Sequence, residues 1–194
     1  VNKMLKIAIT GGIGSGKSVL ATLLKTMGYP VYNSDVEAKK LCNSSPQLKK
    51  KLQQAFGENL YQNDELNKVA FSTIIFSNSD KLKLANSIIH PFVTNHFLQW
   101  AQKQQTSLVF IESAILFESE LINHIDQSIL IIADEATRIQ RVMKRDKAPT
   151  EQVLARIKNQ LPETERIQKA DFIIYNDNKQ AIIPQLEKIL AFLQ

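Results

Sequence analysis

The chain has 194 residues, of which 44% are hydrophobic and 22% charged, the composition of a globular domain that buries its own core without metals or disulfides. Its single cysteine, Cys42, excludes an intramolecular disulfide, fits a reducing compartment and is expected to be an inert packing thiol. The formal net charge is +5, but the sequence has no zinc-ligand spacing and no aromatic residues interleaved with the basic ones. No nucleic acid is therefore expected as a partner. No apolar run resembles a membrane span or a signal peptide, so no membrane and a cytoplasmic location are expected.

Short β-branched runs alternate with helical patterns from the start of the chain. Residues 6–10 predict a buried strand that stops at two glycines, and residues 18–27 predict a helix closed by Gly28. A second strand is predicted at 30–32, followed by helices over 36–42, 47–56 and 67–76. A long helix is expected over 80–105, where Pro91 should kink it or mark a boundary.

The second half of the chain continues this alternation. Strands are predicted at 108–111, 128–132 and 172–175, and helices at 135–145, 150–160, 163–170 and 179–193. Strands separated by helices indicate a parallel sheet with helical crossovers, hence one α/β domain with three layers and five parallel strands. We expect a core of residues 1–35, 106–138 and 170–194. Residues 36–105 exceed a simple crossover and should form a helical acceptor lobe, and residues 139–169 a basic helical lid.

The segment Gly11–Ser18 reads GGIGSGKS and matches the phosphate-binding pattern G-x-x-x-x-G-K-[ST] between a predicted strand and helix. Its glycines let main-chain N–H groups turn toward phosphate oxygens, and the helix N-terminus adds positive potential. Lys17 is expected to reach the β- and γ-phosphates of ATP, and Ser18 to offer Mg²⁺ a hydroxyl ligand. The alternative, a glycine-rich turn that binds nothing, does not explain the lysine and serine in their places.

Carboxylates follow two of the predicted strands. Asp35 comes just after the second strand, where groups face the crevice of an open α/β sheet, and it could accept the proton of an acceptor hydroxyl. It could equally cap a helix that begins at Val36. Glu112 ends the third strand and could either hold Mg²⁺ through water or pair with an arginine of the lid.

Arginines gather after the fourth predicted strand. Arg138, Arg141 and Arg145 are spaced three and four apart on one helix face, and Arg156 lies on the next helix. Such clusters are commonly solvated faces, but in a P-loop fold this position favours a lid whose guanidinium groups neutralise the transferring phosphoryl group. The base-reading signature N-K-x-D of G proteins is absent from the sequence, which favours a small-molecule kinase.

With these residues, the chain closely resembles the dephospho-CoA kinase family from residue 7 to about residue 176. The loop has the family's form T-G-G-I-G-S-G-K-S, and the family's paired aspartates appear as Asn33-Ser34-Asp35, with the second retained. His90-Pro91 matches a family H-P, and Ala114–Glu118 resembles P-L-L-F-E with alanine for proline. The lid and adenine-side motifs are matched by Arg141, Arg145-Asp146, Arg156, Gln160, Ala170-Asp171 and Asn176, while Arg138 stands where a glutamine is common.

The resemblance implies a P-loop kinase fold and ATP-dependent phosphorylation of the ribose 3′-hydroxyl of dephospho-CoA, with Mg²⁺. It implies catalytic roles for Asp35, Lys17 and Arg145 and a metal-binding role for Ser18. The implied ATP-binding residues are Gly12, Ile13, Gly14, Ser15, Gly16, Lys17, Ser18, Val19, Arg141, Arg145 and Asn176. The implied acceptor-binding residues are Asp35, His90, Leu116, Glu118 and Arg156.

Alternatives remain open at the level of the sequence. His90 could instead be a histidine that packs or caps a helix. A kinase of the nucleoside-monophosphate type would carry a similar loop and lid. A nucleotide-dependent regulatory protein could use the basic lid to bind RNA or a partner protein.

Overall fold

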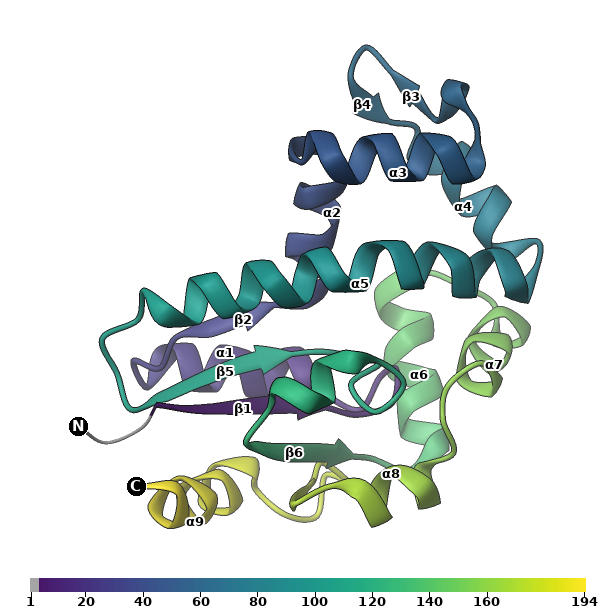
Figure 1. Cartoon of the computed structure of the whole chain (residues 1–194). Helices are drawn as coiled ribbons and strands as arrows, with labels where there is room; N and C mark the ends of the chain where they lie inside the picture. The colour runs from purple at the N-terminus through teal and green to yellow at the C-terminus, as the bar shows by residue number, and fades with distance from the viewer. Residues whose placement is uncertain (1–3) are drawn as a thin grey trace. The chain divides into compact units, whose positions relative to one another are not determined.

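The structure is a computed structural model that describes residues 4–194. The chain divides into two compact units, of which the first contains the residues up to Tyr32 together with Lys103–Gln194, and the second contains Asn33–Gln102. Figure 1 shows the elements of both units in chain order by colour.

The first unit is built on a five-stranded parallel sheet (Figure 1). Its strands are β1 Leu5–Thr10, β2 Val31–Asn33, β5 Leu108–Glu112, β6 Gln127–Ile132 and β7 Phe172–Tyr175, in the order β2-β5-β1-β6-β7. Strand β1 is parallel to both neighbours and aligns Ile9 with Glu112 of β5 and with Ile129 of β6. The carboxyl end of β1 is therefore the switch point where open α/β sheets bind ligands. The predicted fold class is confirmed.

Two helices supply most of the apolar surface that packs on one face of this sheet. Helices α1 Lys17–Thr26 and α9 Ile182–Leu193 carry apolar residues three and four positions apart, which forms a stripe along each helix. The buried cluster contains Ile7, Ile9, Leu20, Leu24, Phe110, Ile129, Ile131, Leu186, Ile189 and Leu190. These contacts hold the N-terminus of α1 beside the end of β1.

Three further helices follow β6, separated by short connections. They are α6 Glu135–Asp146, α7 Thr150–Lys158 and α8 Glu163–Lys169, and they contain most of the residues of the predicted lid. A 3₁₀ helix, Glu120–His124, lies between β5 and β6. Asp134 caps α6 by accepting a hydrogen bond from the Thr137 N–H at 2.8 Å, which fixes where α6 begins.

The second unit is a helical lobe with a small hairpin. Its elements are α2 Ser34–Ser44, α3 Pro46–Phe56, a 3₁₀ helix Glu58–Leu60, β3 Tyr61–Gln62, β4 Glu65–Leu66, α4 Lys68–Phe76 and α5 Ser79–Gln102. Its core is formed by Cys42, Leu48, Leu52, Leu60, Phe71 and Ala85. Burial raises the pKa of the Cys42 thiol to about 11, so this cysteine stays protonated at neutral pH.

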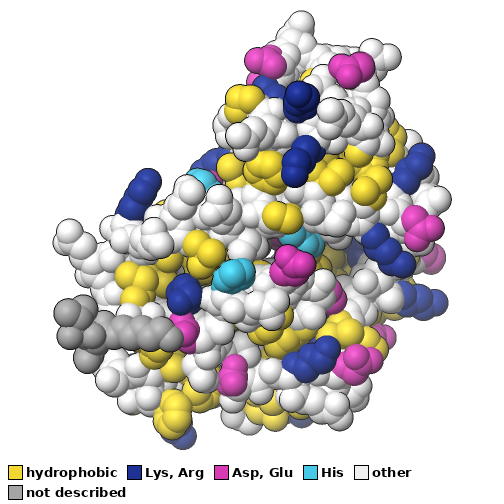
Figure 2. Space-filling view, in the orientation of Figure 1, with side chains coloured by type: hydrophobic (Ala, Val, Ile, Leu, Met, Phe, Trp, Pro, Cys, Tyr) yellow, Lys and Arg dark blue, Asp and Glu magenta, His cyan; other side chains and the backbone are white. Residues whose placement is uncertain are grey.

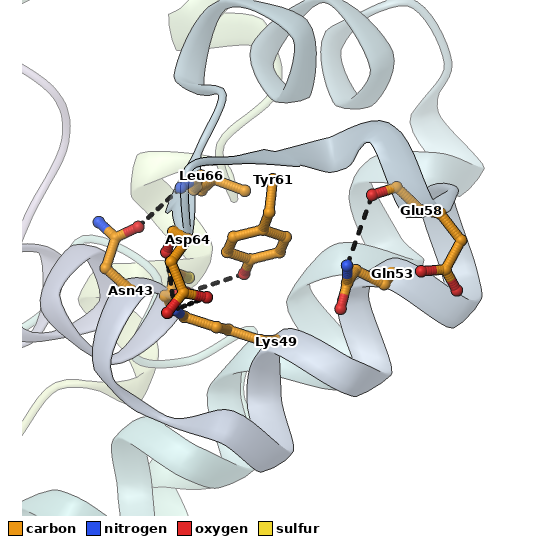
Figure 3. A network of polar contacts seen from close by, with 8 residues as sticks. Asn43, Lys49, Gln53, Glu58, Tyr61, Asp64 and Leu66 are labelled. Atoms are coloured by element: carbon orange, nitrogen blue, oxygen red, sulfur yellow. Dashed lines mark hydrogen bonds and ion pairs between the residues drawn. The ribbon is translucent and has the colours of Figure 1, made fainter.

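The hairpin β3–β4 was not among the elements expected from the sequence (Figure 3). Asn63 and Asp64 adopt φ angles of 49° and 67°, as a two-residue turn with both residues left-handed requires. Two contacts fix the hairpin. The Tyr61 hydroxyl donates to the Cys42 carbonyl at 2.8 Å. The Lys49 ammonium binds the Asp64 carboxylate at 3.0 Å, a contact that Figure 3 draws. The Asn-Asp pair was the sequence signal for this turn.

Helix α5 continues through Pro91, which therefore does not mark a boundary. The helix expected over 80–105 is observed at Ser79–Gln102. The prediction of a long helix is therefore confirmed, and only its bounds differ, by one residue at the start and three at the end. Packing of its buried residues Ala85, Val93 and Phe97 compensates for the hydrogen bond that a proline removes from a helix.

In the part of the chain that the structure describes, none of the helices has the length and hydropathy to cross a bilayer.

Candidate active site

The phosphate loop, Gly11–Ser18, connects the carboxyl end of β1 to the first turn of α1. The Ser15 N–H donates to the Gly12 carbonyl at 3.1 Å, which closes the turn. Gly14 has a φ of +79°, and a Cβ at this position would lie 2.5 Å from the carbonyl oxygen of Arg138. Both the backbone conformation and the space therefore require glycine. The loop presents the N-terminus of α1 to an anion at the carboxyl edge of the sheet.

Ser18 and Glu112 bring two oxygen ligands together beside the loop. The Ser18 hydroxyl donates to Oε1 of Glu112 at 2.7 Å, and Glu112 is only 8% exposed at the end of β5. Because β5 is adjacent to β1, their carboxyl ends meet at the same edge. A hydroxyl and a carboxylate are the hard oxygen donors that Mg²⁺ prefers. This geometry fits the metal-binding interpretation of Glu112.

Lys17 lies over the start of the loop. Its ammonium group donates to the carbonyl oxygens of Gly11 at 2.8 Å and Gly12 at 3.0 Å. The cation is thus held at the mouth of the loop, where the outer phosphates of a nucleotide bind in P-loop proteins.

Two amide side chains contact the loop from the far end of the chain. Oε1 of Gln160 accepts a hydrogen bond from the Ile13 N–H at 2.9 Å. Nδ2 of Asn176 donates to the Ser15 carbonyl at 2.7 Å, and the Asn176 carbonyl in turn accepts from Arg141 at 3.2 Å. The structure therefore places Asn176 against the loop, and Arg141 next to Asn176.

Arg138 is buried against the loop, so the alternative of a solvated arginine face does not hold for this residue. It is 4% exposed, and its Nη1 atom occupies the space where a side chain at Gly12 would lie. Sequence reasoning missed Arg166 of α8, which is 3% exposed and approaches the same glycine. The signal for Arg138 was its position four residues before the buried Val142, on the apolar stripe of α6.

Arg145 and Arg156 are brought together elsewhere, around one carboxylate. Asp146 accepts hydrogen bonds from Nε of Arg145 at 2.7 Å and from Nη1 of Arg156 at 2.9 Å. The hydrogen bond from Arg145 is the largest of the effects that lower the pKa of Asp146. The two arginine side chains are 61% and 50% exposed, so both guanidinium groups lie at the surface of the helices that carry them.

The remaining candidates of the first unit have simple environments. Leu116 is fully buried, as a residue that packs in the core is. Glu118 is exposed and accepts a hydrogen bond from the Leu161 N–H at 3.3 Å. The Val19 side chain is 53% exposed, and its N–H donates to the Gly16 carbonyl at 3.0 Å.

Asp35 lies in the first turn of α2, in the second unit. The cap of this helix is Asn33, whose Oδ1 accepts from the Val36 N–H at 2.9 Å, so Asp35 is not the capping residue. The alternative in which Asp35 caps a helix beginning at Val36 is therefore wrong, because the helix begins earlier, at Ser34. Asparagine caps a helix as well as aspartate does, which explains how this chain tolerates Asn33. Asp35 itself is exposed and available to a ligand.

His90, on α5, lies within electrostatic reach of Asp35 in the same unit. Burial lowers the pKa of His90 below 6.5, and the negative charge of Asp35 partly opposes that shift. The imidazole is therefore neutral near pH 7, with the capacity both to donate and to accept a hydrogen bond.

This pKa shift predicts a pH dependence of stability. Because the folded state holds fewer protons than the unfolded state once the pH falls below 6.5, we expect His90 to destabilise the fold progressively between pH 6.5 and its lower folded pKa. The drop in Tm between pH 7.5 and pH 5.5 should be smaller in His90→Asn than in the wild type. His96→Asn on the same helix is the control. An equal drop in wild type and His90→Asn would contradict the prediction.

The comparisons with known proteins identify the family of the chain. The family described as dephospho-CoA kinase matches residues 5–181. The chain is 41% identical over 190 residues to a dephospho-CoA kinase of Bacteroides fragilis, with 97% of this chain and 93% of that protein covered. A Campylobacter jejuni dephospho-CoA kinase of known structure is 25% identical, with a TM-score of 0.69 and coverage of 96% and 95%. A Thermus thermophilus protein solved by crystallography is 31% identical, with a TM-score of 0.84 and coverage of 99% of both chains. The chain thus belongs to the dephospho-CoA kinase family.

Proposed function

We propose that this chain transfers the γ-phosphoryl group of ATP to the ribose 3′-hydroxyl of dephospho-CoA, which yields coenzyme A in the last step of its synthesis. The observation that carries the proposal is the family match over residues 5–181 on a chain whose phosphate loop is intact at the carboxyl end of β1. A cytoplasmic location is proposed because a single cysteine fits a reducing compartment.

Mg²⁺ is proposed to bind at Ser18 and Glu112. Their oxygen atoms lie 2.7 Å apart beside the loop, and the hydroxyl can exchange its hydrogen bond to the carboxylate for a metal bond. Held by these two residues, Mg²⁺ would supply positive charge that offsets the charge of the phosphates of ATP. The roles of the protein residues are separate: Lys17 binds the outer phosphates, and the loop amides hold the inner ones.

Asp35 is proposed to take or orient the proton of the acceptor hydroxyl. Its carboxylate is exposed on α2, and as a strong acceptor it suits a hydroxyl that must become a nucleophile. Neutral His90 is proposed to hydrogen-bond the acceptor in the same unit. The functional division proposed is a core of residues 1–35, 106–138 and 170–194, an acceptor lobe of 36–105 and a lid of 139–169. Closure of such a lid would exclude water and suppress ATP hydrolysis.

A screen of acceptors tests the function directly. Purified protein is incubated with Mg²⁺·ATP and either dephospho-CoA or each nucleoside monophosphate, and phosphorylated products are identified by mass spectrometry. We expect phosphate to appear on dephospho-CoA alone. Phosphorylation of a nucleoside monophosphate in its place would support the rival kinase class.

A third outcome would indicate a regulatory protein, namely ATP binding without turnover of any acceptor and binding to RNA that weakens steeply with salt. On the face drawn in Figure 2, the lysine and arginine side chains of the described residues are interspersed with aspartate and glutamate. Such mixed charge suits a small ligand bound in a defined site more than a long polyanion.

A further inference from the structure

Two enclosed guanidinium groups lie against the phosphate loop. Arg138 is 4% exposed and Arg166 is 3% exposed. Among residues 4–194, the Nε and Nη1 atoms of both side chains are shielded from solvent and have no hydrogen-bond partner. Burial of a charged donor without an acceptor is strongly unfavourable. A pair of such donors beside an anion-binding loop indicates an anionic ligand that the pair is built to receive.

The two groups converge on one point of the loop. A Cβ on Gly12 would collide with Nη1 of Arg138 and would lie 3.2 Å from Nη1 of Arg166. Burial lowers the pKa of Arg166, and repulsion by Arg138 lowers it further, against the opposing effect of Glu163 and Glu118. Two like charges are therefore held together beside the loop, and burial of Arg166 disfavours its charged form.

The acidic neighbour of Arg138 does not balance its charge. Nη2 of Arg138 is 3.8 Å from the Glu135 carboxylate, which is 61% exposed. An ion pair this long, with one partner in water, contributes little. The buried Nε and Nη1 atoms of Arg138 thus remain charged donors without an acceptor beside the loop.

We propose that Arg138 and Arg166 form a guanidinium clamp for the terminal phosphoryl group of a bound nucleoside triphosphate, an inference that rests on the proposed kinase function. The clamp is at Gly12, the same end of the loop at which Lys17 contacts the carbonyls of Gly11 and Gly12. The inner phosphates belong to the other end, where the loop leads into α1. Arginine forks match the oxygen geometry of a phosphoryl group, which carries the charge that is redistributed during transfer.

A purely structural role predicts different behaviour. If the arginines only packed α6 and α8 against the loop, their removal would lower the stability of the fold. It would also weaken the binding of all nucleotides by the same factor. If the arginines receive a phosphoryl group, removal of one of them relieves the repulsion between the two guanidinium groups and the cost of burying one charge. The Tm of the protein without nucleotide is then unchanged or raised. Binding of triphosphates is then weakened selectively.

The test compares nucleotides that differ by one phosphoryl group. The variants are Arg138→Gln and Arg166→Gln, with Lys144→Gln on α6 and Lys169→Gln on α8 as controls that make the same charge change at exposed positions. Titration calorimetry gives Kd for ADP and for the non-hydrolysable ATP analogue AMP-PNP, with Mg²⁺ and no acceptor. We expect the arginine variants to bind AMP-PNP about 10- to 100-fold more weakly and ADP less than about threefold more weakly. The lysine variants should change neither Kd.

Two results would overturn the clamp. They are equal weakening of ADP and AMP-PNP binding together with a lower Tm, and unchanged binding of both nucleotides. Arg138→Lys, which keeps the charge and loses the fork, should show an intermediate AMP-PNP defect even if a glutamine variant fails to fold. Because the titrations contain no acceptor, they do not depend on dephospho-CoA being the substrate. A protein that fails the acceptor screen can still pass this test, so the two proposals fail separately.

Discussion

Lys17→Ala is expected to lower kcat by about 10²- to 10³-fold, the size of effect seen when one preorganised donor to a developing charge is removed. The ammonium group of Lys17 lies at 2.8 Å and 3.0 Å from two carbonyl oxygens of the loop, which fixes a full positive charge at its mouth. Alanine is a good helix former, so α1 should still begin at this position. Steady-state kinetics with dephospho-CoA, together with calorimetric Kd values for ATP, measure the effect.

Lys25→Ala is the matched control for this variant. It removes the same side chain from the same helix, at the exposed last turn. We expect kcat to stay within about twofold of the wild type there, since an isolated surface change contributes little. A wild-type kcat in Lys17→Ala would mean that the loop binds no transferring phosphate. A large drop in Tm would mean that Lys17 stabilises the conformation of the loop instead.

The loop and the sheet could be predicted because their signals are local. A β-branched strand, the glycine pattern and an amphipathic helix occur within about twenty residues, and the backbone conformation at Gly14 follows from the motif. The five strands were found for the same reason, since each is a short apolar run between helices. The hairpin at Asn63-Asp64 carried an equally local signal, but strands of two residues are too short for a periodic pattern.

The environments of the arginines could not be predicted, because they depend on how distant helices pack. Arg138 and Arg145 lie on the same helix, yet one is enclosed at Gly12 and the other is exposed beside Asp146. Arg166 reaches the same glycine from α8. Spacing within a helix shows which residues share a face, whereas only the tertiary structure shows what that face contacts.

The loop's own hydrogen bonds are consistent with the clamp. The Ile13 N–H is bound by Gln160, and the Ser18 hydroxyl by Glu112. A phosphate that takes over such donors exchanges one hydrogen bond for another, so the net gain is small. For the enclosed nitrogens of Arg138 and Arg166, an arriving phosphate oxygen supplies an acceptor where the protein supplies none. The largest gain in binding free energy should therefore come from this pair.

The second large effect is expected at Asp35. Asp35→Asn should lower kcat by about 10²- to 10⁴-fold, the usual contribution of a general base, because the amide cannot accept the proton of the acceptor hydroxyl. Binding of ATP and dephospho-CoA should change little, since the side chain keeps its size and an acceptor oxygen. The carboxylate also lies in the first turn of α2, where a negative charge stabilises a helix by about 0.3–1 kcal/mol. A small decrease in Tm is therefore expected alongside the loss of rate.

Glu37→Gln separates these two contributions. It makes the same carboxylate-to-amide change two residues further along α2, where Glu37 pairs with Lys40 at 2.7 Å. The two variants should lose similar stability, and only Asp35→Asn should lose rate. Because α2 is capped by Asn33 and not by Asp35, a normal kcat in Asp35→Asn would leave its carboxylate with no role beyond the helix dipole. The proton would then have to leave by another route, and the kinase mechanism proposed for this chain would need a different base.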